Sequence, residues 1–531
     1  MPEEMEVLTG RARVAAGIAI ALIVAAGIFL RFFTHSALWL DEALTVDRSR
    51  LPIGDIVSSL KQDGAPPLYY YLLHFWMELF GQSDLATRSL SGVIGVATLP
   101  VAWLAANRFA GRTAAWITLV LFASAPFAVY YSTEARMYAL EMLLTGCGYL
   151  ALSRAVERPR PGNLIAIGVV TAALLYTQYW SLYLIAAIGI WLLGSAWLDR
   201  RTRAEPPLPT AEPRHPLPAF FAVVGGCILF VPWLPVFLYQ SKHTGTPWAK
   251  PPNFGAIVSA LTAFTDNQGS LGVGTTQGRI LAVIYLVMLP LAVFGIGRSR
   301  RVIDLDLHTR PQARGMAFAV IGTLFLAVAG GILTGSAFAP RYASVIFLPL
   351  LLLVALGFTT LFSLRIRLVV LALAVAAGLF ASFQNIDTQR TQASQVAAVI
   401  NAHARPGDII AFCPDQLGPA VFRLTDQPSH YRMTTFPHGT SPAFVDWVDY
   451  EKAVTSVNPT SFADKLASEA GATHRIWLVW EPGYETLDSR CEHLVTSLLG
   501  DSQFKAYQWV SSNGYEYYEP MYMTEYTPAS T

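Results

Sequence analysis

Two adjacent carboxyl groups, Asp41 and Glu42, stand in the stretch FTHSALWLDEALTV (33–46), directly after a long apolar run. Trp39 and Leu40 precede them, so the backbone there is expected to lie against apolar packing. Many carboxylates at a membrane boundary are only solvated. A carboxylate held in this setting could instead act as a general base or bind a divalent metal ion. The pair is therefore a candidate catalytic site.

A second group of polar residues follows another apolar run, in YYSTEARMYAL (130–140). Glu134 and Arg136 are two residues apart and Tyr138 follows them. Ionisable groups at the membrane boundary are costly and are often functional. Arg136 could bind a phosphate through paired N–H donors, with Tyr138 beside it and Glu134 as a further catalytic candidate. The alternative is a structural ion pair within the turn.

Two further residues could contribute to binding. Arg341, in SAFAPRYASVIF (336–347), precedes an apolar run and could bind a phosphate at the rim of a pocket; the alternative is an arginine that extends to the membrane interface. His243 could ligate a metal or contact substrate, or could be an ordinary surface histidine.

Several familiar motifs are missing from the sequence. It contains no P-loop, no GxGxxG after a strand, no HExxH, no paired CxxC and no GxSxG. We therefore expect no nucleotide cofactor.

Composition and hydropathy predict a membrane protein. Of the 531 residues 53% are hydrophobic and only 14% charged, and the net charge of +1 gives no sign of a nucleic-acid partner. About eleven apolar runs approach the length that a spanning helix needs. They lie near 13–33, 89–107, 113–130, 139–155, 163–179, 181–198, 218–240, 279–297, 315–335, 342–362 and 368–384.

Arginines predict the orientation of these runs, because cytoplasmic loops are enriched in Lys and Arg. If the N-terminus is cytoplasmic, the loops on that side hold most of the arginines, including Arg11, Arg108, Arg112, Arg158 and Arg200. We therefore expect a retained N-terminal anchor, a cytoplasmic N-terminus and an extracytoplasmic segment after residue 384. The Arg-rich loops favour a bacterial plasma membrane.

The first outer segment, 34–88, is expected to form two surface helices. Apolar residues recur at helical spacing from Ile53 to Leu60, after Pro52. The stretch DGAPPLYYYLLHFWMELFG (63–81) is apolar but too short to cross a bilayer.

The last segment, 385–531, has more Asp and Glu than Lys and Arg and no spanning run. We predict a helix at 391–404, strands at 407–414 and 475–482, and a hairpin around Asn513-Gly514 within 504–520. Together these indicate a small extracytoplasmic α/β domain. Cys413 and Cys491 could form a disulfide there or be separate buried thiols. Its tryptophans (Trp447, Trp477, Trp480 and Trp509) could stack on sugars or belong to the core.

Together these motifs resemble the GT-C superfamily of membrane glycosyltransferases, in particular the glycosyltransferase family 39 and protein-mannosyltransferase-like branch. The resemblance rests on LWLDEALT (38–45), DGAPPLYYYLLH (63–74), YYSTEARMYAL (130–140) and PRYASVIFLPLLLL (340–353), and covers about residues 13–384. It implies a GT-C transmembrane module at 1–384 followed by the extracytoplasmic domain at 385–531.

The resemblance also implies a reaction. Family members transfer sugars from polyprenyl phosphate carriers on the extracytoplasmic side. The base or metal-linked role falls on Asp41, with Glu42 beside it, and Glu134 and Arg136 fall near the donor phosphate. Some relatives hold a divalent metal, for which Asp63 and His243 are the matching positions. Relatives often carry His directly before the Pro-Pro pair, where this chain has Ala65.

The expected function is transfer of a sugar, mannose in the first instance, from a polyprenyl phosphate to a glycan, lipid or protein acceptor of the cell envelope. An arabinose-type sugar is a lesser alternative. A transporter or lipid flippase is a second alternative. Its ionisable or broken-helix sites would lie near mid-membrane, whereas the charged residues here cluster at the outer boundary. A non-catalytic scaffold would leave the acidic and arginine-containing turns unexplained.

Overall fold

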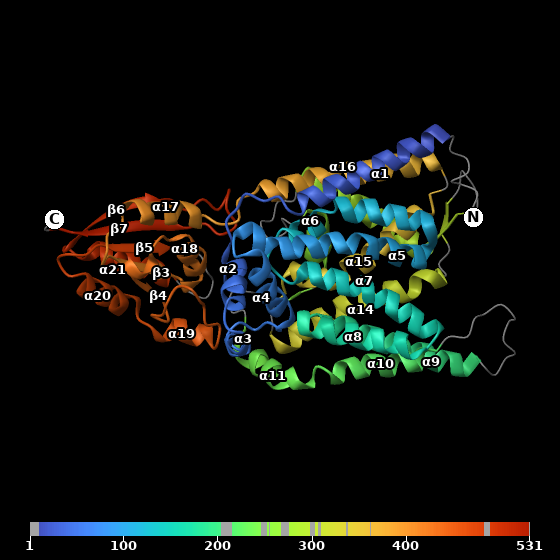
Figure 1. The fold of residues 1–531 in the computed structure, drawn as a ribbon, viewed down its shortest axis with the longest axis horizontal. Coiled ribbons are helices and arrows are strands. Elements are labelled where there is room, and N and C mark those ends of the chain that lie inside the picture. The colour runs from blue at the N-terminus through green and yellow to red at the C-terminus, as the bar shows by residue number, and fades with distance from the viewer. Residues whose placement is uncertain are drawn as a thin grey trace. The chain divides into compact units, whose positions relative to one another are not determined.

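The computed structural model of the protein describes residues 10–202, 215–245, 252–253, 255–266, 275–297, 303–305, 309–335, 338–361, 363–482 and 489–529 (Figure 1). The chain folds into two compact units. The first unit contains Met1–Thr34, Arg88–Trp233 and Pro251–Ile386; the second contains His35–Thr87, Leu234–Lys250 and Asp387–Thr531.

The first unit is almost entirely helical. Its elements are α1 (Gly10–Leu30), α5 (Asp84–Ser124), α6 (Pro126–Ser132), α7 (Tyr138–Glu157), α8 (Pro161–Thr177), α9 (Ser181–Thr202), α10 (Pro216–Ile228), η1 (Val231–Trp233), α12 (Gly255–Asp266), α13 (Thr276–Phe294), α14 (Pro311–Thr334), η2 (Pro340–Ala343), α15 (Ser344–Phe358) and α16 (Leu364–Asp387). A short antiparallel pair, β1 (Gly295–Gly297) and β2 (Ile303–Leu305), follows α13.

Within the described residues, eight helices are long and apolar enough to cross a membrane. One of them, α5, is two helical stretches joined at Gly111, whose φ of 81° breaks the helix between two of the predicted runs. The predicted runs near 139–155 and 163–179 correspond to α7 and α8. The expected polytopic helical membrane protein is confirmed.

Helix α15 lies at the centre of the first unit. Every one of its residues is buried, and it packs against α13, α7 and α14. Its sequence, SVIFLPLLLLVALGF, is apolar on all sides, as expected for a helix enclosed by others. Gly357 lets it approach α13 closely, because a Cβ there would lie 2.0 Å from the Met288 carbonyl oxygen.

The second unit contains a five-stranded sheet in the order β4-β3-β5-β7-β6. Its strands are β3 (Ile409–Cys413), β4 (Arg432–Thr435), β5 (Ile476–Trp480), β6 (Phe504–Val510) and β7 (Tyr522–Pro528). β3 is parallel to β4 and β5, whereas β7 is antiparallel to β5 and β6. The helical elements around the sheet are α17 (Ala393–His403), η3 (Asp415–Leu417), α18 (Gly418–Leu424), η4 (Pro428–His430), α19 (Tyr450–Ser456), α20 (Pro459–Ala470) and α21 (Arg490–Gly500).

Alternate residues of the central strands build a core on each face of the sheet. Ile409 and Ala411 join one core with residues of α20 and α21. Ile410 and Phe412 join the other with residues of α17 and α18. This arrangement explains why both predicted central strands read as continuous apolar runs.

The first outer segment belongs to this second unit. It forms α2 (Leu40–Ser49), α3 (Ile53–Leu60) and α4 (Leu68–Phe80), and α11 (Leu234–His243) lies in the same unit. Trp39, Leu40 and Leu44 share a core with strand β3 and with α20 and α21. The start of α2 is therefore packed on the C-terminal sheet, a grouping that the sequence did not reveal.

Most predicted elements of the second unit are confirmed: α3, α4, α17, β3 and β5 lie where their sequence patterns indicate. The predicted hairpin is confirmed in its first strand and its antiparallel pairing, but the position of its second strand was wrong. β6 pairs with β7, but β7 begins only at Tyr522, beyond the predicted range. Glu519 instead pairs with the backbone around Thr391, because its N–H bonds to the Arg390 carbonyl and its carbonyl accepts from Gln392.

Candidate active site

Helix α2 gives Asp41 and Glu42 different surroundings. Both lie in its first turn, but successive residues of a helix point about 100° apart. Glu42 is fully buried and its Oε2 lies 3.5 Å from Nη1 of Arg390, which is also buried. Asp41 remains partly exposed. Of the two carboxyl groups, Asp41 is therefore the one that a substrate could reach.

The segment around Arg390 holds this end of α2 in place. The Arg390 backbone N–H donates to Ser36 Oγ at 2.8 Å. The Trp39 ring meets the Tyr518 ring edge-on, with centroids 5.1 Å apart. The residues just before Asp41 are thus anchored to two segments from the end of the chain.

Asp63 lies in a buried polar cluster. Its Oδ1 is 3.5 Å from Nε of Arg48, which is fully buried, and its Oδ2 accepts from the Tyr70 hydroxyl at 2.5 Å. Arg48 also donates to the carbonyls of Ser59 and Val445. These contacts tie α2 to α3, to the start of α4 and to the loop before α19.

His243, at the end of α11, lies in a more exposed setting. Its Nδ1 is 3.1 Å from Oδ1 of Asp449, and its ring stacks on Tyr239 with centroids 4.7 Å apart. No three His, Cys, Asp or Glu side chains among the described residues gather in a way that could hold a metal ion. Asp63 is thus engaged by Arg48 and Tyr70, and His243 by Asp449 through Nδ1.

The Glu134–Arg136 turn lies in the first unit, between α6 and α7. The Arg136 N–H donates to the Glu134 carbonyl at 2.7 Å, and Ser91 Oγ donates to the Arg136 carbonyl at 3.2 Å. Glu134 is 1% exposed, and Tyr138 is fully buried in the first turn of α7. Both side chains are therefore buried.

Tyr131, which the sequence analysis did not single out, connects the predicted residues of this unit. Its ring lies 4.7 Å from that of Tyr138. Burial raises the pKa of Tyr131; the Glu134 carboxylate raises it further, and the Arg341 guanidinium opposes the rise. Tyr138 thus contacts this buried phenol, and the charges of Glu134 and Arg341 act on it. The doubled tyrosine before the turn was the available signal, but aromatic pairs are common in apolar segments.

Arg341 lies in η2, immediately before the buried helix α15. Its guanidinium carbon is 5.6 Å from the centroid of the Tyr342 ring, which contacts Trp180 at 5.6 Å. The aromatic neighbours limit the directions in which the guanidinium can point.

Arg31 is a second residue that the sequence analysis missed. It is 1% exposed and donates to the Ala123 and Phe122 carbonyls at 3.0 and 2.8 Å, at the C-terminal end of α5. A cation is favourable at that end of a helix. Gly95 of α5 makes room for Ser132 of α6, because a Cβ at Gly95 would lie 2.1 Å from Ser132 Oγ. Together these contacts set where α6, and hence the Glu134 turn, begins.

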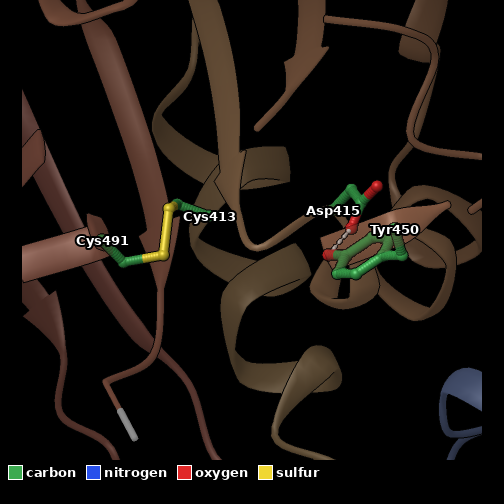
Figure 2. The surroundings of a disulfide bond; sticks show 4 residues. All are labelled: Cys413, Asp415, Tyr450 and Cys491. Carbon is green, nitrogen blue, oxygen red and sulfur yellow. Dashed lines mark hydrogen bonds between the residues drawn. A yellow bond between two sulfur atoms is a disulfide. The ribbon is translucent and has the colours of Figure 1, made fainter. Parts of the chain in front are cut away.

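In the second unit a buried carboxyl group and the disulfide lie near the ends of parallel strands (Figure 2). Cys413, the last residue of β3, is bonded to Cys491 of α21. Asp415 is 1% exposed and accepts from the Tyr450 hydroxyl at 2.6 Å and from His438 Nδ1 at 2.8 Å. The hydrogen bond to Asp415 raises the pKa of His438. Both Asp415 oxygens are therefore satisfied within this cluster.

The tryptophans of the second unit divide by burial. Trp447 and Trp477 are 7% and 0% exposed and belong to its cores. Trp480 and Trp509 are half-buried. Of the four, only these last two keep a surface on which a sugar could stack.

Comparison with known proteins relates the chain to membrane glycosyltransferases. Residues 64–211 match the family model described as dolichyl-phosphate-mannose-protein mannosyltransferase. No curated protein sequence matches the chain significantly.

Two solved structures of ArnT from Cupriavidus metallidurans resemble the whole chain. The structure bound to undecaprenyl phosphate has 13% sequence identity and a TM-score of 0.53, covering 97% of this chain and 98% of ArnT. The apo structure has 13% identity and a TM-score of 0.55, covering 96% and 98%. The chain therefore has the GT-C fold, as the motifs of its outer segments indicated.

Proposed function

We propose that the protein is a glycosyltransferase that moves a sugar from a polyprenyl phosphate carrier to an acceptor of the cell envelope. One observation carries this proposal: nearly the whole chain shares the fold of ArnT, which has been solved with undecaprenyl phosphate. The family match over residues 64–211 and the partly exposed Asp41 on α2 support it.

The proposed reaction needs one base. The acceptor hydroxyl attacks the anomeric carbon of the donor sugar while Asp41 takes its proton. The bond from that carbon to the phosphate oxygen breaks, and polyprenyl phosphate leaves with the electron pair. A phosphate leaves without being protonated, so no second carboxyl group must act as an acid, unlike in glycoside hydrolysis. Displacement in a single step inverts the anomeric configuration.

Arg136 and Arg341 are the proposed phosphate ligands. Guanidinium groups suit phosphate because their N–H donors match two of its oxygens. The Tyr342 ring lies beside the Arg341 guanidinium group, and Ser91 Oγ donates to the Arg136 backbone carbonyl. A preorganised cation stabilises the developing charge on the leaving group. Glu134 and Tyr138, the second of which contacts Tyr131, would set the position of these cations.

A metal ion is not given a role in this reaction. Asp63 is engaged by Arg48 and Tyr70, and Nδ1 of His243 by Asp449. The function assigned to Asp63 is to hold the first outer segment together.

Mannose is the proposed sugar, because the matching family model is one of mannosyltransferases. The proposed location is a bacterial plasma membrane, with the second unit on the outer face. The arginine distribution of the loops supports that orientation.

The test is transfer by the purified full-length protein in liposomes. Polyprenyl phosphates carrying radiolabelled mannose or arabinose are supplied with a cell-envelope extract, and GDP-mannose without carrier lipid serves as control. We expect label to reach an envelope component only from the lipid-linked donors, and faster from the mannose carrier. Transfer from GDP-mannose alone would contradict the proposal. The absence of transfer from every lipid-linked donor would also contradict it. Transfer only from the arabinose carrier would refute mannose and keep the reaction.

A further inference from the structure

Glu141 is a buried carboxyl group that the proposed reaction does not use. It lies in the first turn of α7, within the predicted spanning run at 139–155, and it is 0% exposed. An ionisable side chain in such a run is costly to bury and is therefore a candidate for a functional role. The side chains that Glu141 contacts indicate what this role is.

Two serine hydroxyl groups from other helices donate to Glu141. Ser181 Oγ donates to Oε1 at 3.2 Å, and Ser344 Oγ donates to Oε2. Ser181 is the first residue of α9 and Ser344 is the first residue of α15, and both serines are fully buried. Both carboxyl oxygens of Glu141 therefore have a partner, and this one side chain joins the N-terminal ends of three helices.

The contact with Ser344 acts close to Arg341, one of the two proposed phosphate ligands. Arg341 lies three residues before Ser344, in η2, which leads directly into α15. Its guanidinium carbon is 5.6 Å from the centroid of the Tyr342 ring, and that ring contacts Trp180, just before α9, with centroids 5.6 Å apart. A ring contact and a hydrogen bond to Glu141 therefore hold the segment that follows Arg341.

The backbone of Glu141 leads to the other proposed phosphate ligand, Arg136. The Glu141 N–H donates to the Met137 carbonyl at 3.0 Å, and Met137 directly follows Arg136. The Thr145 hydroxyl, one turn further along α7, donates to the Glu141 carbonyl at 2.8 Å. Glu141 therefore connects the helix that follows one of these arginines to the helix that follows the other.

We propose that Glu141 is a positioning residue that fixes the start of α15 against α7 and α9 through its two serine contacts. It thereby sets where Arg341 lies relative to Arg136. Its effect on the reaction rests on the proposed function, because it acts only through these two arginines. The anchoring of α15 is a property of the fold and can be measured without substrate.

Two substitutions of similar size separate the hydrogen bonds of Glu141 from simple packing. Glu141→Gln keeps an oxygen and a nitrogen that can both bond to serine hydroxyl groups, whereas Glu141→Met fills the space without either. Since apolar side chains often replace buried ionisable groups without loss of stability, we expect the Met variant to fold. The donor phosphate is already charged before the reaction, so displacing an arginine should weaken donor binding. We expect the Met variant to raise the donor KM about tenfold with kcat near the wild-type value, and the Gln variant to match wild type.

Ser344→Ala tests the same contact with a smaller change. It should raise the donor KM of wild type but have no further effect in the Glu141→Met variant, because both changes remove one contact. The control is Thr145→Val, which removes a buried hydroxyl whose bond stays within α7 and should leave the donor KM unchanged. A wild-type donor KM in Ser344→Ala or in a folded Met variant would overturn the proposal, and so would equal rises in the Gln and Met variants.

Hydrogen exchange tests the anchoring of α15 without any substrate. In the purified full-length protein, the amides of residues 341–350 should exchange faster in Glu141→Met and Ser344→Ala than in wild type, Glu141→Gln and Thr145→Val. Unchanged exchange in the first two variants would refute the proposal even if sugar transfer is observed. Faster exchange in those variants, when wild type transfers no sugar, would refute the proposed function and leave the anchoring role standing.

Discussion

At the scale of single residues, adjacent carboxyl groups acquire different properties from distant partners. Glu42 is buried against Arg390, 348 positions away in the chain, whereas Asp41 remains partly exposed. The sequence could identify the pair, because its position after an apolar run is visible locally. It could not say which member is accessible, because that depends on a cation contributed by a remote segment.

The same limit applies to Asp63 and His243. Their residue types suit a metal, but the side chains that engage them, Arg48, Tyr70 and Asp449, are visible only in the fold. Glu134 and Arg136 were selected from the turn motif alone, and their roles stay predictions. Tyr131 and Arg31 escaped notice because their roles arise from burial.

The role of Arg136 can be tested by its effect on the donor. If its guanidinium binds the carrier phosphate, Arg136→Ala should raise the donor KM by about tenfold to a hundredfold, the range expected when a charged hydrogen bond is lost. Arg136→Lys should recover part of the loss. The measurement is initial transfer rate against donor concentration, with the exposed Arg160→Ala as control. An unchanged donor KM would remove Arg136 from the phosphate site.

At the scale of elements, the position of each site depends on close packing between helices. Helix α2 was missed in the sequence because Trp39 is a poor capping residue and the helix has only ten residues. The hairpin was misplaced because the turn signal at Asn513-Gly514 is real locally, while Glu519 pairs with the Thr391 segment instead of continuing β7. Strands β3 and β5 were predicted because their apolar runs directly reflect burial on both faces.

Gly95 tests how strictly α5 positions the Glu134 turn. A Cβ at this position would collide with Ser132 Oγ, two residues before Glu134. Gly95→Ala should therefore displace α6 and lower kcat by about tenfold, since small shifts of reacting groups are costly. Gly162→Ala, where a Cβ meets nothing within 4 Å, is the control for steady-state transfer assays. Equal activity of the two variants would show that the contact does not position the turn.

Removing the disulfide tests how much it contributes to the stability of the sheet in the second unit. Cys413 and Cys491 are 78 positions apart, so their bond restricts a long loop in the unfolded chain. Replacing both by alanine should lower the stability of this unit by about 2–5 kcal/mol. Hydrogen exchange of the β3 and β5 amides in the full-length protein should become faster.

The free cysteines Cys147 and Cys227 provide the control, because their double alanine variant should leave exchange in the sheet unchanged. If both double variants exchange at the wild-type rate, the disulfide contributes no stability to the sheet.

At the scale of the whole molecule, apolar periodicity and motif order were sufficient to predict the GT-C fold and the presence of a terminal α/β domain. They did not predict that 35–87 and 234–250 would belong to the same unit as that domain. Hydropathy distinguishes membrane-embedded segments from water-exposed ones, but it carries no information about which outer segments pack together. That depends on specific contacts such as those of Trp39 and Arg48 with the C-terminal segment.

The central claim is that Asp41 acts as the base in transfer from a polyprenyl phosphate carrier. The most direct measurement compares kcat for transfer from polyprenyl phosphate mannose by wild type, Asp41→Asn and Asp55→Asn, an exposed carboxylate of the same segment. The account predicts that Asp41→Asn loses about 10²–10⁴-fold in kcat with donor binding retained, and that Asp55→Asn matches wild type. Wild-type transfer by Asp41→Asn would contradict it.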